Sequence, residues 1–342
     1  MALLFIEGFD QYDIGTFGQS GKFIQGLGTA PAIAASPGAS PFSPQCLSCS
    51  NDNDIFALFP TPAATTTIIF GFGYYHSTTY SNSIINLYTD VLDNSTNRMC
   101  YLDHNLGNLS WVIEGGATTS LATNVIQTGV WHWIEVKVTL SGTTPSPLEL
   151  RVDGNTVYTG SIITTRSTMG DSPILKAVRF SDLDSRYMYL DDIYVCDSSG
   201  STNNDFLGRV SVVALKPNGN GAVNNFTPVG AANNWECVDN AGRNSSDTAY
   251  VYSTTPGHKD LYTFQNLDPK YTNVKGVAFN GSIRAVGDSG QKMKFVINNQ
   301  SSSRQISYVY DDKRQFITET SDGTNAWTPA TVNSVEAGFE VE

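Results

Sequence analysis

Charged residues are scarce in this sequence. Asp, Glu, Lys and Arg make up 15% of its 342 residues, well below the roughly 25% of an average globular protein. Few stretches combine the Ala, Leu, Glu, Lys and Arg that favour helices, whereas Thr, Val, Ile, Tyr and Phe recur in short runs that suit strands. The composition therefore predicts a protein with almost no helix.

Positive charge is the scarcer sign. Lys and Arg number 20 against 32 Asp and Glu, which gives a net charge of −12. Binding to nucleic acid requires clustered basic residues, so we expect no nucleic-acid partner. No apolar run approaches the roughly 20 residues of a membrane span, and the apolar start at residues 1–10 lacks the basic region of a signal peptide. We expect synthesis in a cytoplasm, with no signal peptide and no membrane insertion.

Cysteine is also sparse, and the count is odd: Cys46, Cys49, Cys100, Cys196 and Cys237. Scattered cysteines of this kind imply no disulfide framework. The spacing of Cys46 and Cys49 matches half of a zinc site, but no second Cys or His pair stands at ligand spacing to complete four ligands. We expect free thiols.

Strand signals are regular from about residue 54 onward. Residues 131–140 (WHWIEVKVTL) alternate, with Ile134, Val136 and Val138 on the face that should pack inward. The turn residues Asp153 and Gly154, flanked by alternating apolar positions, predict a tight hairpin. Many short strands without helical punctuation predict an all-β chain, built as two antiparallel β-sandwich or jelly-roll domains in tandem.

The sequence also suggests where the domains lie. We expect a β-sandwich over residues 1–197, with a Gly/Pro/Ser-rich insertion at about 15–53 that favours loop-like backbone. Residues 198–208 are polar and resemble a flexible linker. A second β-sandwich is expected over 209–342, beginning with a strand at 210–215.

Motifs for catalysis are missing. A glycosidase needs two carboxylates about 5–9 Å apart, and no acidic motif of the glucanase type is found; Glu135 and Glu149 fit the solvent face of their strands. No nucleophile elbow and no phosphate-binding loop accompany the four histidines, and His132 fits a structural position at the core side of its strand. We therefore expect no catalytic residues, no cofactor and no enzymatic activity.

Carbohydrate binding is a further possibility, because aromatic rings can stack on sugars. Aromatic rings in a sandwich are more often part of the core. The candidates for such contacts are Tyr74, Tyr75, Trp111, Trp131, Trp133 and Trp235.

Three segments resemble the concanavalin A-like (laminin G-like) sandwich over about residues 1–197. They are WHWIEVKVTL at 131–140, ELRVDGNTVY at 149–158 and YLDDIYV at 189–195. In such modules the first and last strands pair, and acidic residues of both often hold a structural calcium ion. The resemblance implies a possible calcium site at Glu7, Asp10, Asp191 and Asp192; acidic strand ends in solvent are the alternative.

The junction between the two halves carries a second resemblance. The run YLDDIYVCDSSGSTNNDFLG at 189–208, with FIEGFD at the start and NWECVD and GHKDLYTF downstream, is similar to structural proteins of tailed bacteriophages. This resemblance implies a non-enzymatic virion protein, foremost a tail-fibre or tail-associated adhesion component, located in the virion. Its partners would be other virion proteins, further copies of itself and a host surface glycan. Two alternatives remain open, a capsid decoration (cement) protein and a carbohydrate-binding module or lectin.

Overall fold

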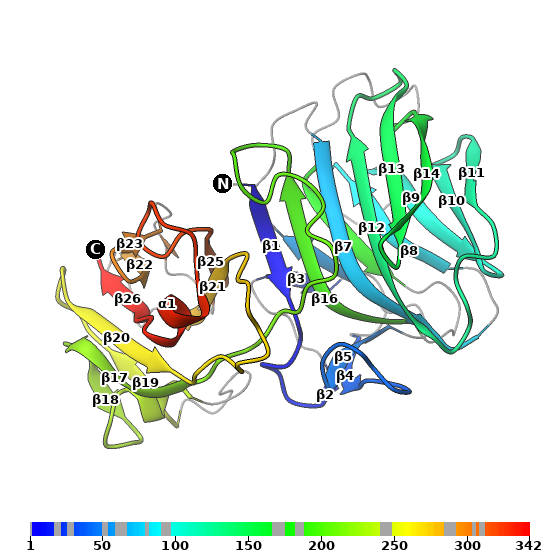
Figure 1. Ribbon diagram of the computed structural model, residues 1–342. Helices are drawn as coiled ribbons and strands as arrows, with labels where there is room; N and C mark the ends of the chain where they lie inside the picture. Colours follow the sequence, from blue (N-terminus) through cyan, green and yellow to red (C-terminus); the bar gives the residue numbers. More distant parts are fainter. Residues whose placement is uncertain are drawn as a thin grey trace. The chain divides into compact units, whose positions relative to one another are not determined.

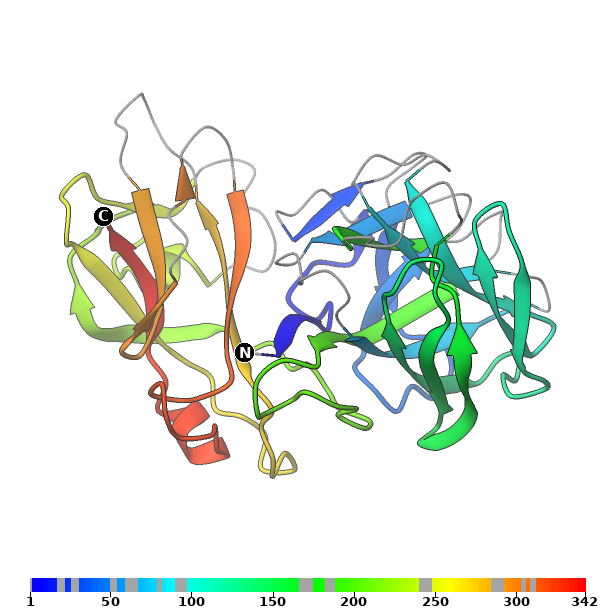
Figure 2. The ribbon, with the colours of Figure 1, turned by 90° about the horizontal axis from the view of Figure 1, so that it is seen from above.

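A computed structural model describes residues 2–16, 22–25, 31–49, 54–58, 67–78, 82–89, 97–165, 175–181, 188–239, 248–283, 292–302, 306–307 and 312–342. The chain forms two compact units, Met1–Val213 (unit 1) and Ala214–Glu342 (unit 2). Figure 1 shows both, and Figure 2 gives the view from above.

Unit 1 contains two antiparallel sheets. Sheet A has, in spatial order, the strands β14 (Asn155–Ile162), β13 (Ser146–Val152), β12 (Trp131–Thr139), β7 (Thr67–His76), β16 (Met188–Asp197), β5 (Gln45–Cys49), β4 (Ala32–Ala35) and β2 (Gly15–Thr16). The strand β1 (Leu3–Glu7) also pairs with β16.

Sheet B has, in spatial order, the strands β11 (Thr118–Ala122), β10 (Asn108–Ile113), β9 (Arg98–Asn105), β8 (Asn82–Tyr88), β15 (Ala177–Ser181), β6 (Asp54–Leu58) and β3 (Phe23–Gln25). One apolar cluster joins buried residues of both sheets, such as Phe72 and Ile134 from sheet A with Leu102 and Phe180 from sheet B. A shared core between two antiparallel sheets is a β-sandwich, so the predicted all-β fold class is confirmed.

Two local predictions for sheet A are confirmed. Ile134, Val136 and Val138 are at most 1% exposed, so this face of β12 does pack inward. The hairpin between β13 and β14 turns at Asp153 and Gly154, whose φ angles of 51° and 80° are those of the expected tight turn.

The expected loop-like insertion at 15–53 contributes strands instead. In its described part, β4 and β5 pair with each other and extend sheet A, while β3 pairs with β6 in sheet B. Burial of Ile33 and Leu47 explains why this Pro-rich segment is extended rather than loose. Residues 17–21, 26–30 and 50–53 of the insertion lie outside the described residues.

The first and last strands of unit 1 pair, as the sandwich resemblance implies. In β1 and β16, Phe5 lies opposite Val195 and Glu7 opposite Ile193. The β16 strand bulges where Asp192 adopts a φ of 50°, which turns its side chain out of the regular alternation.

Unit 2 is built on a six-stranded antiparallel sheet. Its strands are β17 (Pro217–Asn224), β20 (Lys259–Phe264), β26 (Ala337–Val341), β22 (Lys292–Ile297), β23 (Gln300–Ser301) and β24 (Ile306–Ser307). Two strand pairs accompany it: β18 (Thr227–Val229) with β19 (Tyr250–Tyr252), and β21 (Val277–Ile283) with β25 (Asp312–Thr318). Phe279, Phe295 and Phe339 meet edge to face, with ring centroids 5.2–5.7 Å apart, in the core.

A short helix that the sequence did not predict precedes the last strand of unit 2. It is α1 (Pro329–Asn333), and Thr328 caps its start by accepting a hydrogen bond from the Thr331 N–H. Among the described helices, none is long and apolar enough to cross a membrane.

The segment after β16 differs from the expectation. Residues 198–213 belong to unit 1, although 198–208 resemble a tether in sequence, and no strand is formed at 210–215. Side chains of sheet A accept hydrogen bonds from backbone N–H groups of this segment, as described next.

Candidate functional site

The most elaborate polar site lies on the outer face of sheet A, which we define as the strand residues on the side of the sheet that faces away from the sandwich core. These come from β7 (Gly71, Gly73, Tyr75), β12 (Trp131, Trp133, Glu135, Lys137), β13 (Glu149, Arg151) and β16 (Tyr189, Asp191, Tyr194). They alternate with the buried apolar residues of the same strands, which is why one face is core and the other polar.

One half of this face is aromatic. Phe42, from the loop before β5, places its ring centroid 5.3 Å from that of Trp131 and 5.8 Å from that of Trp133. Trp133 in turn stacks on Tyr194 with centroids 6.2 Å apart. Trp131 is 8% and Trp133 2% exposed, so these rings cover one another and not a ligand.

The other half is charged. Glu135 lies opposite Arg151, and Lys137 lies opposite Glu149, in the register of β12 and β13. Arg151 binds Glu149 at 2.8 Å. The side chains of Lys137 and Arg151 remain about one-third exposed, at 32% and 34%.

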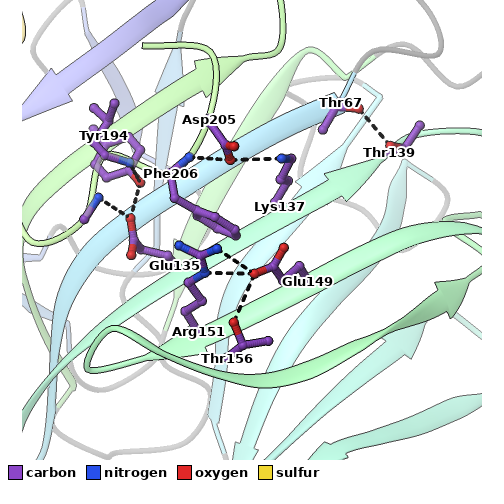
Figure 3. A network of polar contacts seen from close by, with 12 residues as sticks. Thr67, Glu135, Lys137, Thr139, Glu149, Arg151, Thr156, Tyr194, Asp205 and Phe206 are labelled. Carbon is purple, nitrogen blue, oxygen red and sulfur yellow. Dashed lines mark hydrogen bonds and ion pairs between the residues drawn. The ribbon is translucent and has the colours of Figure 1, made fainter.

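The backbone of residues Asp205–Val212, which we call the strap, crosses this face (Figure 3). The N–H of Gly208 donates to Glu135 Oε1 at 2.9 Å, and the N–H of Leu207 donates to the Tyr194 hydroxyl at 3.1 Å. The N–H of Val212 donates to Asp192 Oδ1 at 2.6 Å. Of these three donors only the Val212 N–H lies within the strand expected at 210–215, and because it binds a side chain it is not available to a neighbouring strand.

The first residues of the strap contact the charged half of the face. Asp205 binds Lys137 at 2.9 Å, and this contact holds the pKa of the Asp205 carboxyl below its usual value. The Phe206 ring centroid lies 4.0 Å from the Arg151 guanidinium carbon and 5.7 Å from Lys137 Nζ. Figure 3 shows the Phe206 ring between these side chains.

Two glycines make room for these contacts. A Cβ on Gly71 would lie 2.0 Å from the Tyr194 ring, and one on Gly8 would lie 2.1 Å from the Val212 carbonyl oxygen. Only glycine lets the ring and the strap approach the backbone so closely.

The structure corrects the predicted environment of Glu135. The side chain is on the outer face, as its alternation indicates, but it is 1% exposed because the strap covers it. The Tyr194 hydroxyl donates to the same carboxylate at 2.6 Å. Burial, reinforced by the Glu135 charge, raises the pKa of the Tyr194 hydroxyl.

The four residues predicted to bind calcium lie close to one another but have different partners. Glu7 forms an ion pair with Lys22 at 2.6 Å and accepts the Phe9 N–H. Asp191 Oδ2 accepts both the N–H and the hydroxyl of Ser43.

Burial raises the pKa of each of the three aspartates in this group. The pKa of Asp191 rises to about 7, and that of Asp192 rises well above its usual value because of burial and the neighbouring Asp191 charge. Burial also raises the pKa of Asp10. Within the described part of the chain, Asp10 Oδ1 and Asp192 Oδ2 are buried without a hydrogen-bond partner.

These two oxygens are the atoms that fit a cation best. Over the described residues, however, no group of three or more His, Cys, Asp or Glu side chains is arranged to hold a metal ion. The calcium site therefore stays a prediction. Protonation of Asp191 or Asp192 is the alternative, because a proton would also neutralise a buried carboxylate charge.

The histidine and cysteine predictions have simpler outcomes. His132 Nδ1 binds Asp153 Oδ2 at 2.7 Å, and its Nε2 accepts the Gln127 N–H at 2.9 Å, which is the expected structural role. All five cysteines are free and buried.

The aromatic residues predicted to meet a sugar are mostly inaccessible. Tyr74, Trp111, Trp131 and Trp133 are buried, and Tyr75 and Trp235 are half-buried.

The exposed rings lie elsewhere, on β19 in unit 2. Tyr250 is 43% and Tyr252 49% exposed, and no other aromatic side chain of the described residues is exposed. Their ring centroids are 6.3 Å apart. In the sequence, the only sign of this pair is the alternation Tyr-Val-Tyr at 250–252. The same alternation occurs in strands whose aromatic residues are buried, so it does not reveal the exposure.

The sequence matches no family model, and no curated protein matches it. Solved structures are similar in fold. A cellulose-induced protein is 13% identical at a TM-score of 0.40, over 60% of this chain and 100% of that one. An endo-β-1,4-glucuronan lyase from Trichoderma reesei is 13% identical at 0.36, over 56% and 94%. An alginate lyase is 10% identical at 0.38, over 56% and 96%.

These matches contradict two predictions. The prediction of a bacteriophage virion protein, whether tail fibre or capsid decoration, is wrong, because the three structures named above are two polysaccharide lyases and a cellulose-induced protein, and none of them is described as a virion component. The prediction that the chain is not an enzyme is contradicted as well, since lyases share the sandwich fold. At 10–13% identity the likeness concerns the fold alone, so a function has to be argued from this chain's own residues.

Proposed function

We propose that this protein binds carbohydrate and that Tyr250 and Tyr252 form a contact surface for the sugar. The observation that carries the proposal is the exposure of these two rings, side by side on one strand. Every other aromatic side chain of the described residues is at least half-buried.

The geometry of β18 and β19 supports this role. Tyr250 and Tyr252 are two residues apart, so they point to the same face of the strand. Across the strand pair, Thr227 lies opposite Tyr252 and is itself exposed, which adds a hydroxyl beside the rings. Flat apolar rings next to hydroxyl groups suit a sugar, whose ring has apolar C–H faces and a polar rim.

The energy of such a contact sets the expected affinity. A ring contact contributes about 0.5–1.5 kcal/mol beyond its buried area, so two rings give a weak, fast-exchanging site. Binding to a long polysaccharide would gain from repeated sites along the chain.

The test is a screen of the full-length protein on an array of neutral glycans, followed by titration of any glycan that binds. Tyr250→Ala and Tyr252→Ala should each weaken binding about 2- to 12-fold, as the loss of one ring contact predicts. Tyr271→Ala, a half-buried tyrosine of the same unit that contacts Lys270, is the matched control and should leave binding unchanged. An array without binding, or a double variant that binds like the original protein, refutes the proposal.

A further inference from the structure

The strap places one carboxylate and one ring on the two cations of sheet A. Asp205 supplies the carboxylate to Lys137, and Phe206 supplies the ring to Arg151. A uronic acid, which is a sugar ring carrying a carboxylate, offers the same two groups within one residue. We propose that the strap is an internal occupant of an anion-binding face and that a carboxylated polysaccharide displaces its tip, Asp205 and Phe206.

The two cations are suited to such a ligand. Lys137 and Arg151 come from neighbouring strands and are about one-third exposed even under the strap. Arg151 is held in place by Glu149, whose Oε1 also accepts a hydrogen bond from the exposed Thr156 hydroxyl. That carboxylate and hydroxyl are groups that can exchange hydrogen bonds with sugar hydroxyls, and a guanidinium can bind a carboxylate or stack on a ring.

The tip of the strap is held less strongly than the rest, so the tip can detach from sheet A while the rest of the strap stays bound. The Leu207 and Gly208 N–H groups bind Tyr194 and Glu135, and the Val212 N–H binds Asp192; the three acceptor residues are at most 1% exposed. The tip depends on an ion pair in which Asp205 is 64% exposed, a kind of contact that contributes little in water. The boundary between the two parts is therefore at Leu207, whose N–H binds the Tyr194 hydroxyl, whereas the Phe206 N–H binds only the Asp205 carboxylate of the tip itself.

The charge of the tip favours a carboxylated sugar over a neutral one. Displacing Asp205 leaves Lys137 without its anion, and a neutral sugar cannot replace that charge. A ligand carboxylate can, so the exchange conserves the number of ion pairs. This inference concerns unit 1 and does not depend on the tyrosine pair in unit 2.

The decisive experiment is a calorimetric titration of the full-length protein with oligogalacturonate. Replacing both tip residues (Asp205→Ala with Phe206→Ala) removes the internal occupant and should tighten binding about 3- to 30-fold, the effect of losing one exposed ion pair and one cation–π contact. Adding Lys137→Gln and Arg151→Gln to that variant should abolish the gain. Asp268→Ala, an exposed acidic residue of unit 2 that also pairs with a lysine, is the matched control and should bind like the original protein.

Proteolysis gives a second, independent readout. Oligogalacturonate should speed chymotryptic cleavage after Phe206 in the original protein, because displacement of the tip exposes the Phe206 ring, which otherwise packs on Arg151. Neutral cello-oligosaccharide of the same length should not. The Tyr250→Ala/Tyr252→Ala variant should respond to oligogalacturonate like the original protein, which separates this site from the proposed neutral-sugar site.

Three outcomes overturn the proposal. The tip variant binds oligogalacturonate no more tightly than the original protein, or the Lys137 and Arg151 substitutions leave binding intact, or poly-glutamate binds more tightly than oligogalacturonate. The last result would make the ligand an acidic polypeptide. Melting temperatures of all variants within a few degrees of the original protein confirm that they are folded.

Discussion

Replacing Asp192 by Asn should stabilise unit 1 at neutral to alkaline pH and make the stability of unit 1 less dependent on pH. Asp191 and Asp192 are both fully buried neighbours on β16. Burial raises the pKa of Asp191 from 3.8 to about 7, and it raises the pKa of Asp192 well above 3.8. In the unfolded chain both carboxyls ionise near pH 4.

The sign of the effect follows from these shifts. Between about pH 4 and pH 7 these two carboxyls bind more protons in the folded protein than in the unfolded chain, so their contribution to stability is greatest below pH 4 and is lost as the pH rises through 7. A shift of about three units corresponds to about 4 kcal/mol at 1.36 kcal/mol per unit. The loss should appear as a falling melting temperature of unit 1 from pH 4.5 to pH 8, in buffer containing a chelator.

The Asp192→Asn variant removes one of the two charges and keeps the local geometry. Asn accepts the positive φ of 50°, and its Oδ1 can still accept the Val212 N–H. At pH 8 we expect added stability, seen as a melting temperature that is higher by about 2–4 °C for each kcal/mol gained in a unit of this size. At pH 4.5, where the carboxyl already carries a proton, we expect little change.

Asp191→Asn is the matched control. Both oxygens of Asp191 accept hydrogen bonds, from the Asp192 N–H and from Ser43, so an amide nitrogen would face a donor and lower stability at every pH. The reasoning is refuted if Asp192→Asn melts below the original protein at pH 8, or if its melting temperature falls between pH 4.5 and 8 as steeply as the original's.

Three further predictions concern unit 1 or the whole chain. Gly71→Ala should cost about 1–3 kcal/mol in urea unfolding, because the new methyl group meets the Tyr194 ring; an unchanged midpoint would contradict the close approach. Calcium at the predicted site should raise the melting temperature at pH 7 in the original protein but not in Asp192→Asn, and equal melting with calcium and with chelator would exclude the site. The five buried thiols should react with a thiol reagent only after unfolding; rapid labelling of the native protein would show that one is accessible.

Alternation in the sequence predicts the faces of a strand but not what covers them. Ile134 and Val136 could be assigned to the core because apolar residues at every second position have one way to be buried. The same rule places Glu135 on the outer face. It could not show that the strap, 70 residues later, buries that carboxylate.

The strap itself shows why residues 210–215 were predicted as a strand. Val210, Val212 and the residues between them alternate as an extended segment would. Whether extended backbone joins a sheet edge or lies across a sheet face depends on where its N–H groups bind. Here the Val212 N–H binds a side chain of β16, which no local pattern records.

The aromatic residues illustrate the same limit. Trp131 and Trp133 alternate on β12 as Tyr250 and Tyr252 do on β19, yet the tryptophans are buried and the tyrosines exposed. The difference is Phe42, which reaches the tryptophans from the loop before β5. Alternation alone therefore does not distinguish an exposed pair of rings from a buried one.

The position of β16 in sheet A has a consequence for how unit 1 folds. This strand is the last of the unit in sequence, yet it pairs with β7 on one side and with β5 and β1 on the other. During synthesis, the edges of β7, β5 and β1 lack their partner until residue 197 has left the ribosome. These strands can complete their pairing only through contacts with β16, which is far from them in the sequence. Such topologies fold slowly, and their open edges can pair with other chains in the meantime. A truncation within β16 should therefore yield aggregates, while a chain ending at Val213 should yield a soluble unit.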